Sequence, residues 1–143
     1  MIKLLYEANP LNEMAIINPR LCKQLSIQVE IEQRDEGPVP HVHVYLDKTR
    51  NPKNCAFVRL DKPEYCTHHK DGKKMNKQQK KEFIQLMGSP CDNFLPDING
   101  NPVKVNWYQN AVHIWSETYE DGSFKKFKTD FNGIPIPPDY STL

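Results

Sequence analysis

The chain lacks a strong net charge, a long apolar run and an export signal. Its 19 Lys and Arg residues against 18 Asp and Glu leave a net charge of +1 over 143 residues, which excludes a strongly basic nucleic-acid coat protein. An apolar content of 38% is too high for a disordered chain, and no apolar run is long enough to cross a membrane. The short apolar run before Glu7 is typical of neither a secretion signal nor a transit peptide. We therefore expect a cytoplasmic protein with no membrane partner.

The sequence also lacks the spaced motifs that mark common enzyme classes. It contains no Gly-rich phosphate loop, no G-x-S-x-G and no H-E-x-x-H, so nucleotide-binding, serine-hydrolase and metalloprotease functions have no support. The four cysteines, at positions 22, 55, 66 and 91, form no C-x-x-C pair. They predict reduced thiols rather than a disulfide framework.

What is present predicts an antiparallel sheet. Apolar and polar residues alternate over Leu25–Glu32, which is typical of a half-buried strand. The runs Val39–Leu46 and Cys55–Leu60, each preceded by turn-forming residues, predict two further strands. Short connections favour antiparallel neighbours, so we expect a three-stranded meander. The residues before 25 are compatible with either strand or helix.

Two helices are predicted downstream. Asn76 suits an N-cap with Gln79 completing a capping box, and Gly88 suits the end of that helix. A second helix is predicted to begin at Asn101-Pro102 and to end at Asp121-Gly122. Its buried stripe is expected to be Trp107, Ala111, Ile114, Trp115 and Thr118, and its polar side Asn106, Asn110, His113 and Glu117.

These elements define the expected fold. The fold class is α+β, with a three-stranded antiparallel meander packed against two C-terminal helices. Residues 1–123 are expected to form a single domain, since 143 residues fit one core. Residues 124–143 are expected to form an extended Pro-rich tail, because three prolines cluster at positions 135, 137 and 138.

The densest group of reactive side chains is His41-Val42-His43-Val44-Tyr45. In a strand, the two histidines and Tyr45 share one face. Two imidazoles about 7 Å apart on one face can chelate a metal ion or divide the acid and base roles of a hydrolysis. The alternative is that both are hydrogen-bonding residues on a sheet face that is covered by a helix or open to water.

Strand pairing extends this group. A turn centred at residues 35 and 36 would place Glu30 across from His41 and Gln28 across from His43. A turn centred near residue 50 would place Arg59 across from His41. The same turn would place Phe57 across from His43.

If the protein is an enzyme, its candidate catalytic residues are therefore His41, His43, Glu30 and Arg59, in a nuclease or phosphodiesterase. Zn, Mn or Mg could bind at the two histidines, although Arg59 beside His41 would repel a cation. We commit to no metal ligand, because these residues match no recognised metal-binding spacing.

The candidate partner-binding residues are mainly lysines. Residues 70–88 carry six basic and two acidic side chains. Cations in the first turns of a helix are slightly unfavourable, so contact with phosphates or an acidic partner is one reason for them, and a solvated polar face is the other. Tyr45 and Phe57, on an exposed sheet beside Arg59, could add base stacking. The proposed binding set is Lys73, Lys74, Lys77, Lys80, Lys81, Tyr45 and Phe57.

The segment Pro40-His41-Val42-His43-Val44 and the Trp-containing helix predicted after it resemble small bacterial proteins of the DUF4160 type. The resemblance covers roughly residues 38 to 60 and rests mainly on the P-H-x-H-V pattern. Such proteins are often encoded beside toxin–antitoxin or mobile-element genes. The resemblance therefore implies a bacterial or phage setting and adds no catalytic residue.

Together these patterns favour an interaction module. Without a catalytic motif but with an uneven charge distribution, the chain is predicted to bind a macromolecular partner, first of all another protein. An inhibitor, an anti-defence protein and a toxin–antitoxin component are the roles that fit this setting. The first alternative is the histidine-based, metal-dependent nuclease or phosphodiesterase. The second is a nucleic-acid-binding protein, which the near-zero net charge disfavours.

Overall fold

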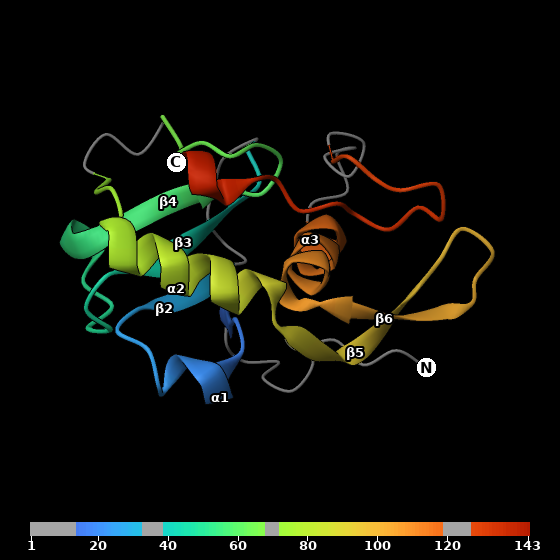
Figure 1. The fold of residues 1–143 in the computed structure, drawn as a ribbon, viewed down its shortest axis with the longest axis horizontal. Helices are drawn as coiled ribbons and strands as arrows, with labels where there is room; N and C mark the ends of the chain where they lie inside the picture. The colour runs from blue at the N-terminus through green and yellow to red at the C-terminus, as the bar shows by residue number, and fades with distance from the viewer. Residues whose placement is uncertain (1–13, 33–38, 68–71, 119–126) are drawn as a thin grey trace.

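A computed structural model describes residues 14–32, 39–67, 72–118 and 127–143, and Figure 1 shows their arrangement. The fold is α+β, as predicted. Four strands form one antiparallel sheet in the order β1-β2-β3-β4. They are β1 (Met14–Ile16), β2 (Gln28–Glu32), β3 (His41–Tyr45) and β4 (Cys55–Arg59). The predicted meander is therefore present as β2-β3-β4. The ambiguous stretch before residue 25 supplies β1 and a short helix, α1 (Pro19–Cys22).

The register between β2 and β3 differs from the expected one by two residues. Glu30 pairs with His43 and Gln28 pairs with Tyr45, so the expected pairings with His41 and His43 were wrong. A shift of two leaves every side chain on the same face, because the side-chain period of a strand is two. The apolar pattern therefore could not distinguish the two registers. Between β3 and β4 the register agrees with the prediction, with His41 opposite Arg59 and His43 opposite Phe57.

Helix α2 (Lys77–Gly88) has the predicted start. The Asn76 side chain accepts a hydrogen bond from the Gln79 N–H, and the Gln79 side chain accepts one from the Asn76 N–H. Glu82 fixes the helix to the segment just before β2. One of its carboxylate oxygens accepts hydrogen bonds from both the N–H and the hydroxyl of Ser26, each at 2.8 Å. These contacts hold α2 in a defined position against β2.

The second predicted helix begins five residues later than expected. Residues Pro102–Asn106 form strand β6, which pairs with β5 (Pro90–Pro96) in a second, two-stranded sheet. Helix α3 (Trp107–Thr118) follows. Asn106 and Gln109 form the reciprocal hydrogen bonds of a capping box, both at 2.9 Å. Asn101 is therefore not the cap. The expected helix end at residues 121–122 lies outside the described residues.

The apolar stripe of α3 is buried as predicted at Trp107, Ala111, Ile114 and Trp115. On the expected polar side, however, Asn110 is fully buried. The oxygen of its side-chain amide accepts a hydrogen bond from the side-chain amide of Asn93 in β5. The small sheet therefore covers a flank of α3 that the sequence pattern assigned to solvent.

One hydrophobic core joins the four-stranded sheet to both long helices. Figure 1 shows α2 running in front of the sheet, with α3 beside it. Val29, Val42 and Val44 of the sheet share this core with Phe83 of α2 and Trp115 of α3. The three valines face this core, and strand alternation places His41 and His43 on the opposite face of β3, where the His41 ring still lies near Trp115.

The described part of the predicted tail packs against this core. Phe127, Ile134 and Tyr140 are buried. Tyr140 begins the short 3-10 helix η4 (Tyr140–Thr142), and its hydroxyl donates to the Arg59 carbonyl oxygen at 2.6 Å. Burial raises the pKa of this hydroxyl well above its ordinary value, so it stays a donor. The domain boundary expected at residues 123 and 124 lies outside the described residues.

Candidate functional site

The histidine face of the large sheet is covered rather than open. His41 and His43 are 1% and 7% exposed, and Glu30 is 1% exposed. The two imidazoles stack with their centroids 5.4 Å apart, and the His41 ring lies 5.4 Å from that of Trp115. The sheet thus brings together three of the four predicted catalytic residues, in an interior position.

His41 has a defined orientation. Its Nδ1 atom lies 2.7 Å from the Val39 carbonyl oxygen. A carbonyl oxygen can only accept, so Nδ1 carries a proton, and in the neutral ring Nε2 is the basic nitrogen. The His43 Nδ1 atom lies 3.5 Å from the Tyr45 hydroxyl.

The Glu30 carboxylate is engaged by two neighbours. It accepts a hydrogen bond from Gln28 at 2.6 Å and forms an ion pair with the Arg50 Nε at 3.2 Å. Arg50 adopts a left-handed backbone conformation, with φ of 55°, and its guanidinium lies 6.0 Å from the centre of the Tyr45 ring. Arg50 was not among the predicted site residues, because its place in a turn gives no sign of its ion pair with Glu30.

Arg59 belongs to a separate ion pair. Its guanidinium binds both carboxylate oxygens of Asp61, at 2.9 and 2.8 Å. This hydrogen bonding raises the pKa of Arg59, and the pair balances its charge. The predicted row of Glu30, His41 and Arg59 is therefore divided between two ion pairs, Arg50–Glu30 and Arg59–Asp61.

The histidine face does not show a ready metal centre. Among the described residues, no three His, Cys, Asp or Glu side chains are grouped so that they could hold a metal ion. His68 and His69, two further donors in the sequence, lie outside the described residues. A metal ion bound at His41 and His43 would therefore need a further ligand that is not a His, Cys, Asp or Glu of the described residues.

Tyr45 and Phe57 differ from their expected environment. We expected both rings on an exposed sheet, where bases could stack on them. They are 6% and 8% exposed and pack together with Cys55 and Cys66. The strand Cys55–Arg59 is flanked by the segment around Cys66, whose N–H donates to the Phe57 carbonyl oxygen. Neither ring therefore offers a free stacking surface.

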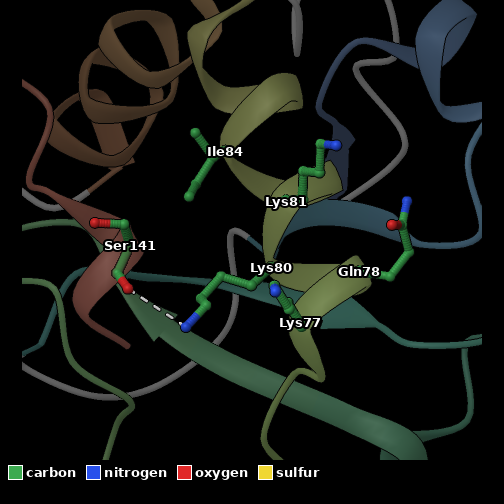
Figure 2. A pocket seen from close by; sticks show the side chains of 6 residues that line it. All are labelled: Lys77, Gln78, Lys80, Lys81, Ile84 and Ser141. Atoms are coloured by element: carbon green, nitrogen blue, oxygen red, sulfur yellow. Dashed lines mark hydrogen bonds between the residues drawn. The ribbon is translucent and has the colours of Figure 1, made fainter.

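Three of the five predicted lysines, in contrast, line a groove at the surface. The groove has a volume of about 480 Å³ and lies along α2 from Lys77 to Ile84. Figure 2 shows Lys77, Lys80, Lys81 and Ile84 along the helix, with Ser141 of η4 opposite Lys80 and joined to it by a hydrogen bond. Spacings of three and four residues place these four α2 side chains on one helix face. We call this feature the lysine groove.

The lysine groove carries unbalanced positive charge. Neither ion pair of the described residues involves Lys73, Lys74, Lys77, Lys80 or Lys81. No acidic residue occupies the first turn of α2. Positive charges there oppose the helix dipole, and like charges four residues apart repel each other. The resulting potential attracts anions.

Lys80 has partners from the chain itself. Its ammonium group donates to the Leu143 carbonyl oxygen at 2.8 Å and lies 3.4 Å from that of Ser141. Tyr140 anchors this segment through ring contacts with Phe83 and Tyr108. The groove is therefore assembled by two elements that are about sixty residues apart in the chain.

Comparisons with protein-family models, with curated proteins and with solved structures found no match to this chain. No helix among the described residues has the length and apolar character needed to span a bilayer.

Proposed function

We propose that this protein is a binding module whose lysine groove takes an anionic surface of a macromolecular partner. The observation that supports the proposal is the charge of the groove, where Lys77 and Lys81 are exposed on one helix face and have no carboxylate partner among the described residues. Lys73 and Lys74, both exposed, extend the positive charge before the helix. In the bacterial or phage setting that the P-H-x-H-V resemblance implies, such a module acts as an inhibitor or a toxin–antitoxin component, by occupying its partner.

The proposal is tested with two anionic probes, a fluorescent dodecamer of glutamate and a fluorescent dodecamer of thymidylate. At low salt we expect the protein to bind at least one of them. Replacing all five lysines of the set with Gln keeps the helix propensity. It should weaken binding by about tenfold or more, because each exposed pair contributes about 0.2 to 1 kcal/mol.

The matched control replaces Lys53 and Lys104, which are exposed and lie outside the groove. The Lys53→Gln/Lys104→Gln variant should bind almost like the wild type. Equal losses in both variants would contradict the proposal, and so would binding that persists unchanged after all five lysines are replaced.

The histidine-based hydrolase is the second candidate. The observation that favours it is the stacked pair of His41 and His43, with Glu30 opposite His43 on the neighbouring strand. For this function, His41→Ala/His43→Ala must abolish cleavage of RNA or DNA. If the wild type cleaves neither polymer with Mg, Mn or Zn added, this function is excluded.

A further inference from the structure

We infer that the lysine groove recognises an extended peptide with two carboxylates at alternate positions and an apolar side chain two residues beyond them. This inference rests on the proposed function and names the ligand of the same site. It is carried by the order of charged and apolar groups along one face of α2. In Figure 2 this order runs from Lys77 to Ile84.

Two lysines in the groove are available for carboxylates. The Lys80 ammonium group binds backbone carbonyl oxygens of residues 141 and 143. Lys77 and Lys81 are exposed, and no described residue forms a hydrogen bond or ion pair with their ammonium groups. The internal contact of Lys80 shows that a lysine of this helix face can donate to backbone carbonyl oxygens beside α2.

The far end of the groove is apolar. Ile84 lines this end and is 39% exposed. It lies one turn beyond Lys80 on the same face of α2. The methylene stems of the lysines extend this apolar surface, because a lysine keeps only its terminal charge in water. An entirely charged ligand would leave Ile84 uncovered, so the best ligand also carries an apolar side chain.

Spacing sets the pattern of the ligand. Along an α-helix, Lys77 and Lys81 are about 6 Å apart and Lys81 and Ile84 about 4.5 Å apart. Alternate residues of an extended peptide lie on one face and are about 6.6 Å apart. Three alternate side chains of an extended ligand can therefore reach these three positions, because the long lysine stems make up the difference in spacing, with the apolar side chain at an end of the series.

The lining of the groove favours a peptide over a nucleic acid. None of its lining residues is aromatic, and the sheet rings Tyr45 and Phe57 are buried. Single-stranded nucleic acids gain much of their affinity from stacking on aromatic rings. An isoleucine beside two lysines offers no such platform.

The test compares peptides of one composition. Fluorescent peptides containing Glu-Ser-Glu-Ser-Leu and Leu-Ser-Glu-Ser-Glu place leucine at either end, which covers both directions of binding. The control, Glu-Ser-Leu-Ser-Glu, places leucine in the middle. We expect one of the first two to bind about fivefold or more tightly than the control, as expected for partial burial of a leucine side chain.

Two single substitutions locate the preference. Ile84→Gln should reduce the difference between the peptides to less than twofold while leaving the binding of glutamate dodecamer nearly unchanged. The matched substitution Ile98→Gln, at a residue that is 72% exposed and outside the groove, should preserve the preference. Circular dichroism of each variant establishes that the fold is retained.

The outcomes separate this inference from the proposed function. If glutamate dodecamer binds through the lysines but the three peptides bind equally, the apolar pattern is wrong and the binding module stands. Tighter binding of the thymidylate dodecamer than of every peptide would also overturn the inference, and would assign the groove to nucleic acid. If neither dodecamer binds, both proposals fail.

Discussion

Glu82 is the buried charge on which the position of α2 depends. Burial alone would raise the pKa of its carboxyl group, but hydrogen bonds from Gln78 and Ser26 outweigh this effect and hold the pKa below its ordinary value. A carboxylate with a lowered pKa stabilises the folded state above its ordinary pKa of 4.5, and this contribution is lost as the pH falls through the folded-state pKa.

We therefore expect Glu82→Gln to lower the free energy of unfolding at pH 7 by about 1.5 to 3 kcal/mol, the usual contribution of hydrogen bonds to a charged group. The difference from the wild type should shrink below pH 4.5, the ordinary pKa of the residue, where protonation removes the same charge. Urea unfolding of both proteins between pH 3 and 7 measures this difference in the free energy of unfolding. A difference that stays constant over this range would show that the charge of Glu82 does not stabilise the fold.

At this scale the sequence predicts which side chains share a face, but not which ones meet. The alternation in β3 placed His41, His43 and Tyr45 together correctly, because a period of two follows directly from strand geometry. Glu30 was expected opposite His41 but pairs with His43, two residues further along β3. Periodicity cannot detect such a shift, because both registers bury the same valines.

The start of α2 combines good local capping with unfavourable charge. Its capping box at Asn76 stabilises the first turn, whereas Lys77 at the first helical position opposes the helix dipole. We expect Lys77→Glu to raise the free energy of unfolding by about 0.3 to 1 kcal/mol at low ionic strength. The same substitution should weaken the binding of glutamate dodecamer.

Stability and binding therefore change in opposite directions at this residue. Thermal unfolding and fluorescence anisotropy measure the two effects on one sample. The control, Lys128→Glu, makes the same charge change at an exposed residue that lies outside the described helices, and should alter stability by less than about 0.5 kcal/mol. If Lys77→Glu leaves binding intact, the residue does not contribute to the site.

Helix α3 provides a second test at the scale of elements. Asn106→Ala removes the side chain of an observed capping box and should cost about 1 kcal/mol of stability. Asn101→Ala, at the cap expected from sequence, should cost clearly less, because no hydrogen bond of the Asn101 side chain occurs among the described residues. Urea unfolding of both variants decides which asparagine begins the helix. A larger cost at Asn101 would contradict the observed start.

The predicted start of α3, at Asn101-Pro102, was wrong for a physical reason. Asn101-Pro102 is a good local beginning for a helix, and Asn106 with Gln109 repeats the spacing of Asn76 with Gln79. Local capping preferences alone do not choose between two such signals. The pairing of β6 with β5 decides between the two signals, because it makes residues 102–106 a strand. The prediction used only neighbouring residues, and β5 is not among them.

At the scale of the whole molecule, the sequence predicts a run of lysines but not the groove that three of them line. Lys77, Lys80 and Lys81 were predicted from the local run of charge. The groove also requires Ser141, whose segment is held against α2 by Tyr140. Contacts between residues this far apart in the chain do not follow from periodicity. The same limit applies to Tyr45 and Phe57, because strand alternation does not reveal what covers a sheet face.

We propose that the partner binds at the lysine groove rather than at the histidine face of the sheet. Titration of the isotopically labelled protein with glutamate dodecamer, followed by amide chemical shifts in two-dimensional NMR, tests it most directly. We expect the largest shift changes at residues 73–84 and 141–143, with residues 28–30, 41–45 and 57–59 nearly unchanged. Changes concentrated at His41, His43 and Glu30 would contradict the claim, and so would the absence of any change at low salt.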